Sequence, residues 1–310
     1  MLGPAPKRKS VLAGGVLMAA ALTALTALGA PAQAAAGTGK YVALGDSYAA
    51  GAGVPGQYAG LCLRSDRNYG HLVAAALHSS SYTDTTCSAA KIKAITSAQY
   101  DAFIRVNDPQ LDSVTADTEL ITIGIGGNDL GTSDLGIADV IATCIGGAVI
   151  NPLGTPCKDH YADGHWDWSS WRWQWGEDTL QRRIAAARPQ LADALQRIHA
   201  KAPKAKVLLV GYPSVLPDDE WDCVGRQPVT VGDVAYLRGV LGSLNSMLAS
   251  TAAANGATYV DTAGPTRGHD ICSADRWIEG TIPHSLAVPF HPNATGEQVM
   301  SRAVLKALGR

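Results

Sequence analysis

Five short runs along the chain combine apolar and β-branched residues without a helical period. They are Tyr41–Leu44, Tyr82–Thr86, Leu120–Ile125, Lys206–Val210 and Thr258–Asp261. Short runs with this composition are typical of strands that are buried on both faces of a sheet. The pattern therefore predicts a parallel sheet of about five strands.

Two segments between these runs place leucine and isoleucine on one face of a helix. The first segment contains Leu237, Leu241, Leu244 and Leu248. The second contains Leu180, Ile184, Leu191, Leu195 and Ile198. Pro189 lies within the second helix and predicts a kink there. Alternating strands and helices are typical of α/β folds, in which helices cover both faces of a parallel sheet.

Residues 1–34 have the parts of a secretory signal peptide. Three basic residues precede an apolar stretch over 11–28, and Ala32 and Ala34 frame a small-x-small cleavage site. A transmembrane anchor is the alternative, but the alanine content, the cleavage site and the marginal length favour a cleaved leader. We therefore expect a single secreted domain over 35–310.

The charge balance argues against a nucleic-acid partner. The chain has 25 basic and 27 acidic residues, which gives a formal charge of −2. Loss of the leader removes three basic residues and no acidic residue, so the charge becomes −5. Such a domain lacks the basic surface that nucleic acids require, and its 276 residues are enough for one α/β core.

All six cysteines follow the predicted leader. They are Cys62, Cys87, Cys144, Cys157, Cys223 and Cys272. An even number of cysteines in an exported chain predicts disulfides, and six cysteines allow 15 pairings that spacing alone does not distinguish. Because the chain has no Cys-x-x-Cys pair, a zinc or redox site is not expected.

Residues 145–177 interrupt the alternation of strands and helices. Five of the seven tryptophans lie close together here: Trp166, Trp168, Trp171, Trp173 and Trp175. The sequence leaves three roles open for this Trp-rich segment. It is compatible with a packed subdomain of buried indoles, with a surface that contacts a lipid interface or an acyl chain, and with a sugar-stacking surface.

A serine follows the first predicted strand. Gly45 and Asp46 end that strand, so Ser47 lies at its carboxyl end, where open α/β sheets place their active sites. On its own, the Gly-Asp-Ser run is equally typical of an ordinary turn. Two motifs further along the chain favour a catalytic role for Ser47.

An asparagine and a histidine occupy comparable positions at the ends of other predicted elements. The third predicted strand ends at a Gly-Gly pair, and the amide of Asn128, which follows, can donate a hydrogen bond to an oxyanion. His291 precedes a helix whose start is marked by Thr295 and Gln298, spaced as a capping box. A histidine in this position is a candidate general base for a serine.

In the order serine, asparagine, histidine, these motifs resemble those of the SGNH (GDSL-type) hydrolase family, and most of all its secreted actinomycete lipases and esterases. The resemblance extends over nearly the whole mature chain and includes Cys62–Ser65, Thr86–Ala90, Gly211–Pro213 and Gly268–Asp270. It implies a flavodoxin-like three-layer α/β/α sandwich with a parallel, about five-stranded sheet. It also implies the disulfides Cys62–Cys87, Cys144–Cys157 and Cys223–Cys272.

The same resemblance implies that Ser47 is a nucleophile and His291 its base. Two other histidines compete for the second role. His269 lies close to Cys272, in a loop that one of the implied disulfides closes. His284 lacks the Pro-Asn run and the helix start that follow His291.

The third member of a catalytic triad departs from the family pattern. Many family members have an aspartate three residues before the histidine, and this chain has Val288 there. We therefore predict a serine–histidine dyad in which a backbone carbonyl, that of Val288, orients the imidazole. Asp270 and Asp275 are the alternative acids.

The oxyanion hole is expected to combine the backbone N–H of Ser47, a backbone N–H from the turn at 87–90 and the side-chain amide of Asn128. Many family members have a glycine in that turn, whereas this chain has none. Ser88 is the best match to the donor, and Ala89 is the next.

These features together predict a secreted lipase or esterase that hydrolyses fatty-acyl esters. A phospholipase of the A type and a polysaccharide deacetylase are alternatives within the hydrolases, and a non-catalytic surface-binding protein is the alternative outside them. No metal or cofactor is expected, because serine, base and oxyanion donors supply the chemistry. We expect a monomer that contacts its ester substrate and, through the Trp-rich segment, a lipid interface.

Overall fold

The structure is a computed structural model that describes part of the chain. It covers residues 39–101, 103–134, 136–162, 165–167, 170–174, 176 and 178–310, together with Gly3. The side chains of 165–167, 173 and 174 are not described. The predicted leader, apart from Gly3, therefore lies outside the described residues, as do the side chains of Trp166, Trp168, Trp173 and Trp175 in the Trp-rich segment.

The centre of the domain is a sheet of five parallel strands. In spatial order they are β2 (Ser81–Asp84), β1 (Lys40–Gly45), β5 (Thr118–Gly124), β8 (Lys206–Val210) and β9 (Thr258–Val260). Each strand falls on one of the five apolar runs. Numbered by appearance in the chain, the order is 2-1-3-4-5, which is that of flavodoxin-like sheets. The predicted fold class is therefore confirmed.

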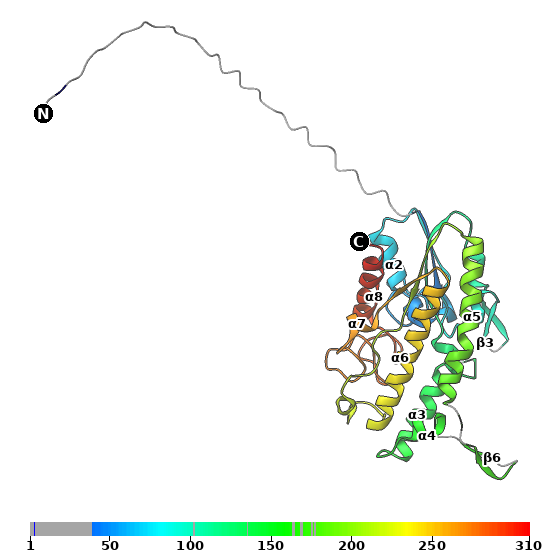
Figure 1. Cartoon of the computed structure of the whole chain (residues 1–310), viewed down its shortest axis with the longest axis vertical. Helices are drawn as coiled ribbons and strands as arrows, with labels where there is room; N and C mark the ends of the chain where they lie inside the picture. The colour runs from blue at the N-terminus through cyan, green and yellow to red at the C-terminus, as the bar shows by residue number, and fades with distance from the viewer. Residues whose placement is uncertain are drawn as a thin grey trace, which may run out of the picture. The chain divides into compact units, whose positions relative to one another are not determined.

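Helices cover both faces of this sheet, because successive strand residues point to opposite sides. Tyr41 and Leu120 pack against α2 (Tyr69–Ala76) and α8 (Ala294–Ala307). Val42 and Ile121 belong to the larger core formed with α5 (Thr179–Lys201) and α6 (Val231–Ala254). Figure 1 shows the two helical layers on either side of the strands.

The two long helices bury the faces that their leucine and isoleucine spacing predicts. In α5 these include Leu180, Leu191 and Leu195, and in α6 they include Leu244 and Leu248. Pro189 lies inside α5 and does not end it, since the helix continues to Lys201.

The remaining described helices range from 4 to 13 residues in length. They are α1 (Ser47–Ala50), α3 (Ala138–Ile150), α4 (Pro156–Tyr161) and α7 (Ala263–Thr266). Two hairpins are formed by β3 (Gln99–Asp101) with β4 (Ile104–Asn107), and by β6 (His165–Asp167) with β7 (Arg172–Gln174). Single 3₁₀ turns are η1 (Gly60–Cys62), η2 (Ile92–Ile95), η3 (Gln110–Ser113), η4 (Gly127–Leu130) and η5 (Glu220–Cys223).

Three disulfides tie loops to this framework. They join Cys62 to Cys87, Cys144 to Cys157, and Cys223 to Cys272. These are the pairs that the family resemblance implies. The first bridge connects η1 with the segment after β2, and the second connects α3 with α4.

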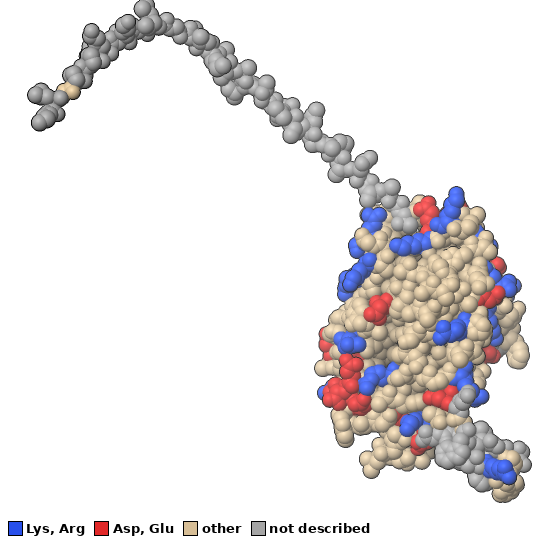
Figure 2. Space-filling model, viewed as in Figure 1, with Lys and Arg blue, Asp and Glu red and all other residues tan. Residues whose placement is uncertain are grey.

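The surface carries charges of both signs. On the face shown in Figure 2, basic and acidic side chains are interspersed rather than gathered into a stripe of one sign. Among the helices that the structure describes, none has the length and hydropathy of a membrane span.

Candidate active site

The switch in strand order places two loops side by side. The chain leaves β1 toward β2 on one side and returns at β5 on the other. In sheets of this order, ligands bind outside the carboxyl ends of the strands at that point. Ser47 follows β1 and Asn128 follows β5, so both residues lie at the switch point.

His291 is brought to Ser47 from the far end of the chain. The Nε2 atom of His291 lies 2.7 Å from the Oγ of Ser47, and its Nδ1 lies 2.8 Å from the carbonyl oxygen of Pro289. A carbonyl only accepts, so Nδ1 carries the proton and Nε2 accepts the hydrogen bond of the serine hydroxyl. The ring of Tyr48 packs 4.6 Å from the imidazole, centroid to centroid.

The orienting carbonyl belongs to Pro289 and not to Val288, which corrects the prediction. The carbonyl of Val288 accepts the backbone N–H of His291 at 3.2 Å and is therefore turned into the backbone. The two alternative acids bind elsewhere. Asp270 accepts the N–H of Cys272, and Asp275 pairs with His269.

The loop that carries His291 is held by a buried glutamate. The backbone of Glu279 pairs with His291 and Phe290, and its carboxylate accepts hydrogen bonds from the N–H of His284 and the amide of Asn293. Burial raises the pKa of Glu279, but these hydrogen bonds and one from Ser285 outweigh it and lower the pKa below the usual value. Glu279 is therefore an ionised anchor of the loop.

Helix α8, which follows this loop, begins differently from the prediction. Its N-cap is Asn293, whose side chain accepts the N–H groups of Thr295 and Gly296. Asparagine caps helices as well as threonine does, and it stands two residues before Thr295. The prediction of a capping box formed by Thr295 and Gln298 is therefore wrong, although the predicted helix is present.

Burial lowers the pKa of His291 to about 4, and the hydrogen bond to Pro289 offsets only part of that effect. No carboxylate contacts the ring among the residues that the structure describes. At neutral pH the imidazole is uncharged, which is the state in which a general base accepts a proton.

A network that the sequence did not reveal joins the serine turn to the asparagine turn. Asp46 accepts the N–H of Tyr48 with one oxygen and the hydroxyl of Tyr212 with the other. The Tyr212 oxygen in turn accepts the N–H of Gly127 at 2.7 Å. Burial raises the pKa of Asp46 to about 7, although the Tyr212 bond lowers it.

The glycines before Asn128 are required by this network. Gly126 has a φ of 117°, which favours glycine, and a Cβ at Gly127 would meet the Tyr212 ring at 3.0 Å. Tyr212 belongs to the Gly211–Pro213 segment of the resemblance. The only signal for its role was a polar-tipped aromatic residue two positions after β8.

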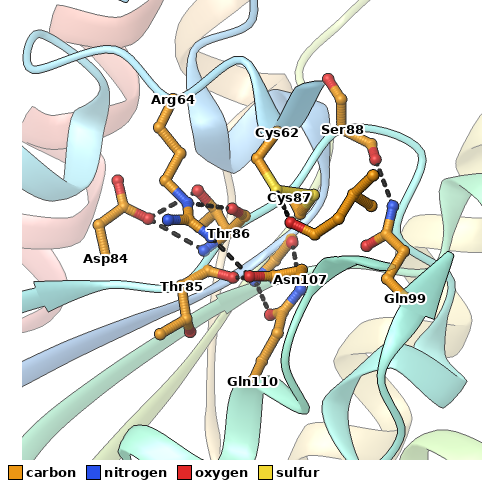
Figure 3. Close-up of a disulfide and its surroundings, with 12 residues drawn as sticks. Cys62, Arg64, Asp84, Thr85, Thr86, Cys87, Ser88, Gln99, Asn107 and Gln110 are labelled. Atoms are coloured by element: carbon orange, nitrogen blue, oxygen red, sulfur yellow. Dashed lines mark hydrogen bonds between the residues drawn. A yellow bond between two sulfur atoms is a disulfide. The ribbon is translucent and has the colours of Figure 1, made fainter. Parts of the chain in front are cut away.

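The backbone N–H of Ser88 is already engaged in a hydrogen bond. This corrects the prediction that Ser88 is the oxyanion-hole donor of the turn after Cys87. The Ser88 N–H donates to the carbonyl of Cys62 at 3.0 Å, and the Ser88 carbonyl accepts from Gln99, as Figure 3 shows for the Ser88–Gln99 pair. Ala89 has a φ of 60°, the conformation in which glycine is favoured. The N–H groups of Ala89 and Ser47 have no acceptor among the described residues.

The side chain of Asn128 is fixed by two hydrogen bonds. Its Nδ2 donates to the carbonyl of Ala90 at 3.1 Å, and its Oδ1 accepts the N–H of Ile137 at 3.2 Å. A primary amide has two N–H donors, so one remains for a further acceptor. The bond to Ala90 also holds Asn128 against the turn that contains Ala89.

A cavity of about 170 Å³ opens beside His291. Most side chains that line it are aliphatic, and those from α3, α5 and α6 include Ile141, Leu180 and Leu241. Tyr48 and Tyr212 also line it, together with His291. The site thus consists of a serine–histidine pair, free N–H donors and an apolar pocket.

Comparisons with known proteins give the family of the chain. The model of the GDSL-like lipase/acylhydrolase family matches residues 43–299. A protein described as lipase 2 of Streptomyces coelicolor is 39% identical, and the alignment covers 99% of both chains. The chain belongs to the GDSL-like lipase/acylhydrolase family. As a GDSL-like hydrolase it is an enzyme, a carboxylic ester hydrolase.

Two solved structures resemble this GDSL-like hydrolase over most of its length. Phospholipase A1 of Streptomyces albidoflavus is 28% identical with a TM-score of 0.64, and the match covers 88% of this chain and 99% of that one. An extracellular lipase of Streptomyces rimosus is 26% identical with a TM-score of 0.62, over 87% and 99% of the two chains.

Proposed function

We propose that the enzyme hydrolyses fatty-acyl esters through an acyl-enzyme on Ser47. The observation that carries the proposal is the 2.7 Å contact of Ser47 Oγ with an unprotonated His291 Nε2 beside an apolar cavity. Serine attacks the ester carbonyl carbon while His291 takes its proton. The C–O bond to the alcohol then breaks, and the alcohol leaves with that proton.

Water completes the cycle. It attacks the acyl-enzyme carbonyl while Nε2 of His291 accepts its proton, and the acid is released as Ser47 regains the proton. The carbonyl of Pro289 keeps the imidazole in the required tautomer throughout. The proposed dyad therefore needs no carboxylate in contact with the ring.

In this proposal, three hydrogen-bond donors stabilise the negative charge that develops on the carbonyl oxygen. They are the N–H groups of Ser47 and Ala89 and the second amide N–H of Asn128. Support comes from the two backbone N–H groups that have no acceptor in the described part of the chain and from the fixed orientation of the amide. Donors that are oriented before the reaction stabilise a tetrahedral intermediate most effectively.

The cavity favours an acyl chain as the group next to the reacting carbonyl. A protein cavity of about 150 Å³ lined by aliphatic residues holds a molecule the size of benzene. The cavity beside His291 is of similar volume, so it suits an acyl chain of roughly six carbons, with longer chains extending beyond it. An acetyl group would leave most of this apolar surface uncovered, which argues against a polysaccharide deacetylase.

A phospholipase A activity is the second candidate. It is supported by the 28% identity with the phospholipase A1 of Streptomyces albidoflavus. The same dyad, oxyanion donors and acyl cavity serve either alcohol, because the acyl side of the ester is common to both.

We also propose that residues 1–34 direct export and are removed. The relatives are Streptomyces lipases, and one of the solved structures is described as extracellular. Disulfides are typical of exported proteins, which adds support. The Trp-rich segment is proposed to contact lipid or a long acyl chain. Trp171, whose side chain is described, is 71% exposed.

A panel of p-nitrophenyl esters from acetyl to palmitoyl, together with phosphatidylcholine and acetylated xylan, tests the proposal. We expect kcat/KM to rise from acetyl to about hexanoyl. The Ser47→Ala variant is expected to lose at least about three orders of magnitude on every substrate. Preference for acetylated xylan over all fatty-acyl esters would contradict it, and preference for phosphatidylcholine would favour the phospholipase.

A further inference from the structure

The hairpin of β3 and β4 exposes several apolar side chains to solvent. Phe103, between the two strands, is fully exposed, and Tyr100 and Ile104 are more than half exposed. Leu61 on η1, which packs against β4, is 58% exposed. We call Leu61, Tyr100, Phe103 and Ile104 the hairpin patch.

Phe103 is unfavourable in this position by two independent criteria. Its φ is 73°, in the left-handed region where a bulky residue is rare and strained. Its ring is fully exposed to water, although phenylalanine is among the residues most often buried. Glycine or asparagine would fit this turn better. A phenylalanine that costs stability twice indicates a role outside folding.

The shape and charge of the hairpin patch fit a lipid surface. β3 lies at the outer edge of the domain (Figure 1), and the patch includes an exposed tyrosine, Tyr100. Tyrosine suits the boundary between apolar and aqueous phases. Asp101, Arg105 and Asp108 leave the hairpin with one net negative charge, and Arg105 pairs with Asp108. This balance favours a neutral or zwitterionic lipid over an anionic one.

The base of the hairpin is bonded to the segment that carries Ala89 (Figure 3). The Gln99 amide donates to the carbonyl of Ser88 at 2.6 Å, and the Asn107 amide donates to that of Thr85 at 2.9 Å. Arg64 bridges the Asn107 side chain and the Thr86 carbonyl. The Cys62–Cys87 disulfide closes the same unit. A hairpin that enters lipid therefore brings the proposed oxyanion segment with it.

We infer that the hairpin patch, with Phe103 at its tip, docks the enzyme on a zwitterionic lipid surface. The inference rests on the proposed function, since the fatty-acyl ester substrate is found in such a surface. It assigns the first contact with lipid to β3–β4, independently of the Trp-rich segment.

Binding of the Ser47→Ala protein to phosphatidylcholine vesicles tests the inference without interference from hydrolysis. Phe103→Asn is the informative change, because asparagine tolerates the left-handed turn and removes the apolar ring. We expect it to weaken vesicle binding at least about tenfold. The Tm of Phe103→Asn should equal or exceed that of the parent protein. In the enzyme that keeps Ser47, Phe103→Asn should leave turnover of a soluble butyryl ester within twofold of the wild-type value. Replacing part of the lipid by phosphatidylglycerol should not strengthen binding.

Val224→Asn is the matched control, because Val224 is 56% exposed and directly follows η5, outside both the hairpin patch and the Trp-rich segment. It should change vesicle binding less than twofold. Absence of vesicle binding by the parent protein, binding of Phe103→Asn within twofold of the parent, or an equal loss in Val224→Asn would overturn the inference. A lipid-free dimer that Phe103→Asn dissociates would also overturn it and assign the patch to a protein contact. Failure of ester hydrolysis with hairpin-dependent vesicle binding intact would contradict the proposed function alone.

Discussion

The hydroxyl of Tyr212 donates a hydrogen bond to the carboxylate of Asp46, and the two residues are 166 positions apart in the chain. Asp46 caps the turn that presents Ser47, and the same hydroxyl accepts the N–H of Gly127, next to Asn128. One phenol thus fixes the two loops that carry the proposed nucleophile and an oxyanion donor. We interpret Tyr212 as a positioning residue for the proposed reaction.

Tyr212→Phe should lower kcat for a soluble ester by about 5- to 150-fold, because leaving buried hydrogen-bonding groups unpaired costs about 1–3 kcal/mol. KM should change little, since the ring remains in the cavity. Tyr236→Phe is the control: it also removes a tyrosine–aspartate hydrogen bond, to Asp178, away from Ser47. Steady-state kinetics of both variants checks this, and a kcat of Tyr212→Phe within twofold of wild type would contradict the positioning role.

The pH dependence of kcat/KM should reflect the lowered pKa of His291. The imidazole accepts a proton only when neutral, and it is neutral above its pKa of about 4. Activity on a soluble ester should therefore decline on the acid side near pH 4, and not near the ordinary histidine value of about 6.5. Circular dichroism at each pH separates this decline from unfolding. An acid limb near 6.5 in a folded enzyme would show that the ring is not desolvated.

The carboxylates around His291 should differ in effect. Asp270→Asn and Asp275→Asn should keep turnover within roughly tenfold, since neither contacts the imidazole, whereas loss of a true triad acid costs about 10⁴ in turnover. Steady-state kinetics measures this effect, and a 10⁴-fold loss in either aspartate variant would reveal a hidden acid.

Glu279→Gln should reduce the free energy of unfolding by about 1.5–3 kcal/mol, because hydrogen bonds to a charged group are lost. Denaturant unfolding measures this change.

Chain-length selectivity should depend on the cavity walls. Each buried CH₂ is worth about 0.8 kcal/mol, so kcat/KM should rise up to about fourfold per methylene until the cavity is full. Ile141 lines the cavity and is only half-buried, so Ile141→Trp should fill the space without disrupting the core. The variant should lose most activity on hexanoyl esters and little on acetyl esters. Equal losses on both esters would place the acyl chain elsewhere.

The central strands β1, β5 and β8 were predictable because they are nearly continuous apolar runs, and burial on both faces leaves such runs few alternatives. The outer strands β2 and β9 are partly exposed, and their β-branched and aromatic residues were the signal. The β3–β4 hairpin was not predictable, since its residues are exposed and mix apolar with polar types. The positions of Ser47 and His291 followed from the motifs. Which carbonyl faces the imidazole depends on the turn at Val288 and Pro289, which composition does not specify.

The N–H donor in the turn at 87–90 was also only partly predictable from the sequence. Ser88 and Ala89 differ by one position, and only the backbone shows which N–H is engaged and which has the left-handed φ. The glycine of many relatives was a usable signal for Ala89, since glycine and a positive φ go together. The partner of Asp46 had no signal near Asp46 in the sequence, because Tyr212 lies after another strand, β8.

Labelling with diethyl p-nitrophenyl phosphate tests the central claim most directly. A serine nucleophile activated by His291 should release one equivalent of p-nitrophenol per enzyme, and peptide mass spectrometry should find the diethylphosphoryl group on Ser47. Ser47→Ala should not be labelled, and His291→Ala should react at least about a thousandfold more slowly. A label on another residue, or a tenth of normal ester turnover retained by either variant, would contradict the account.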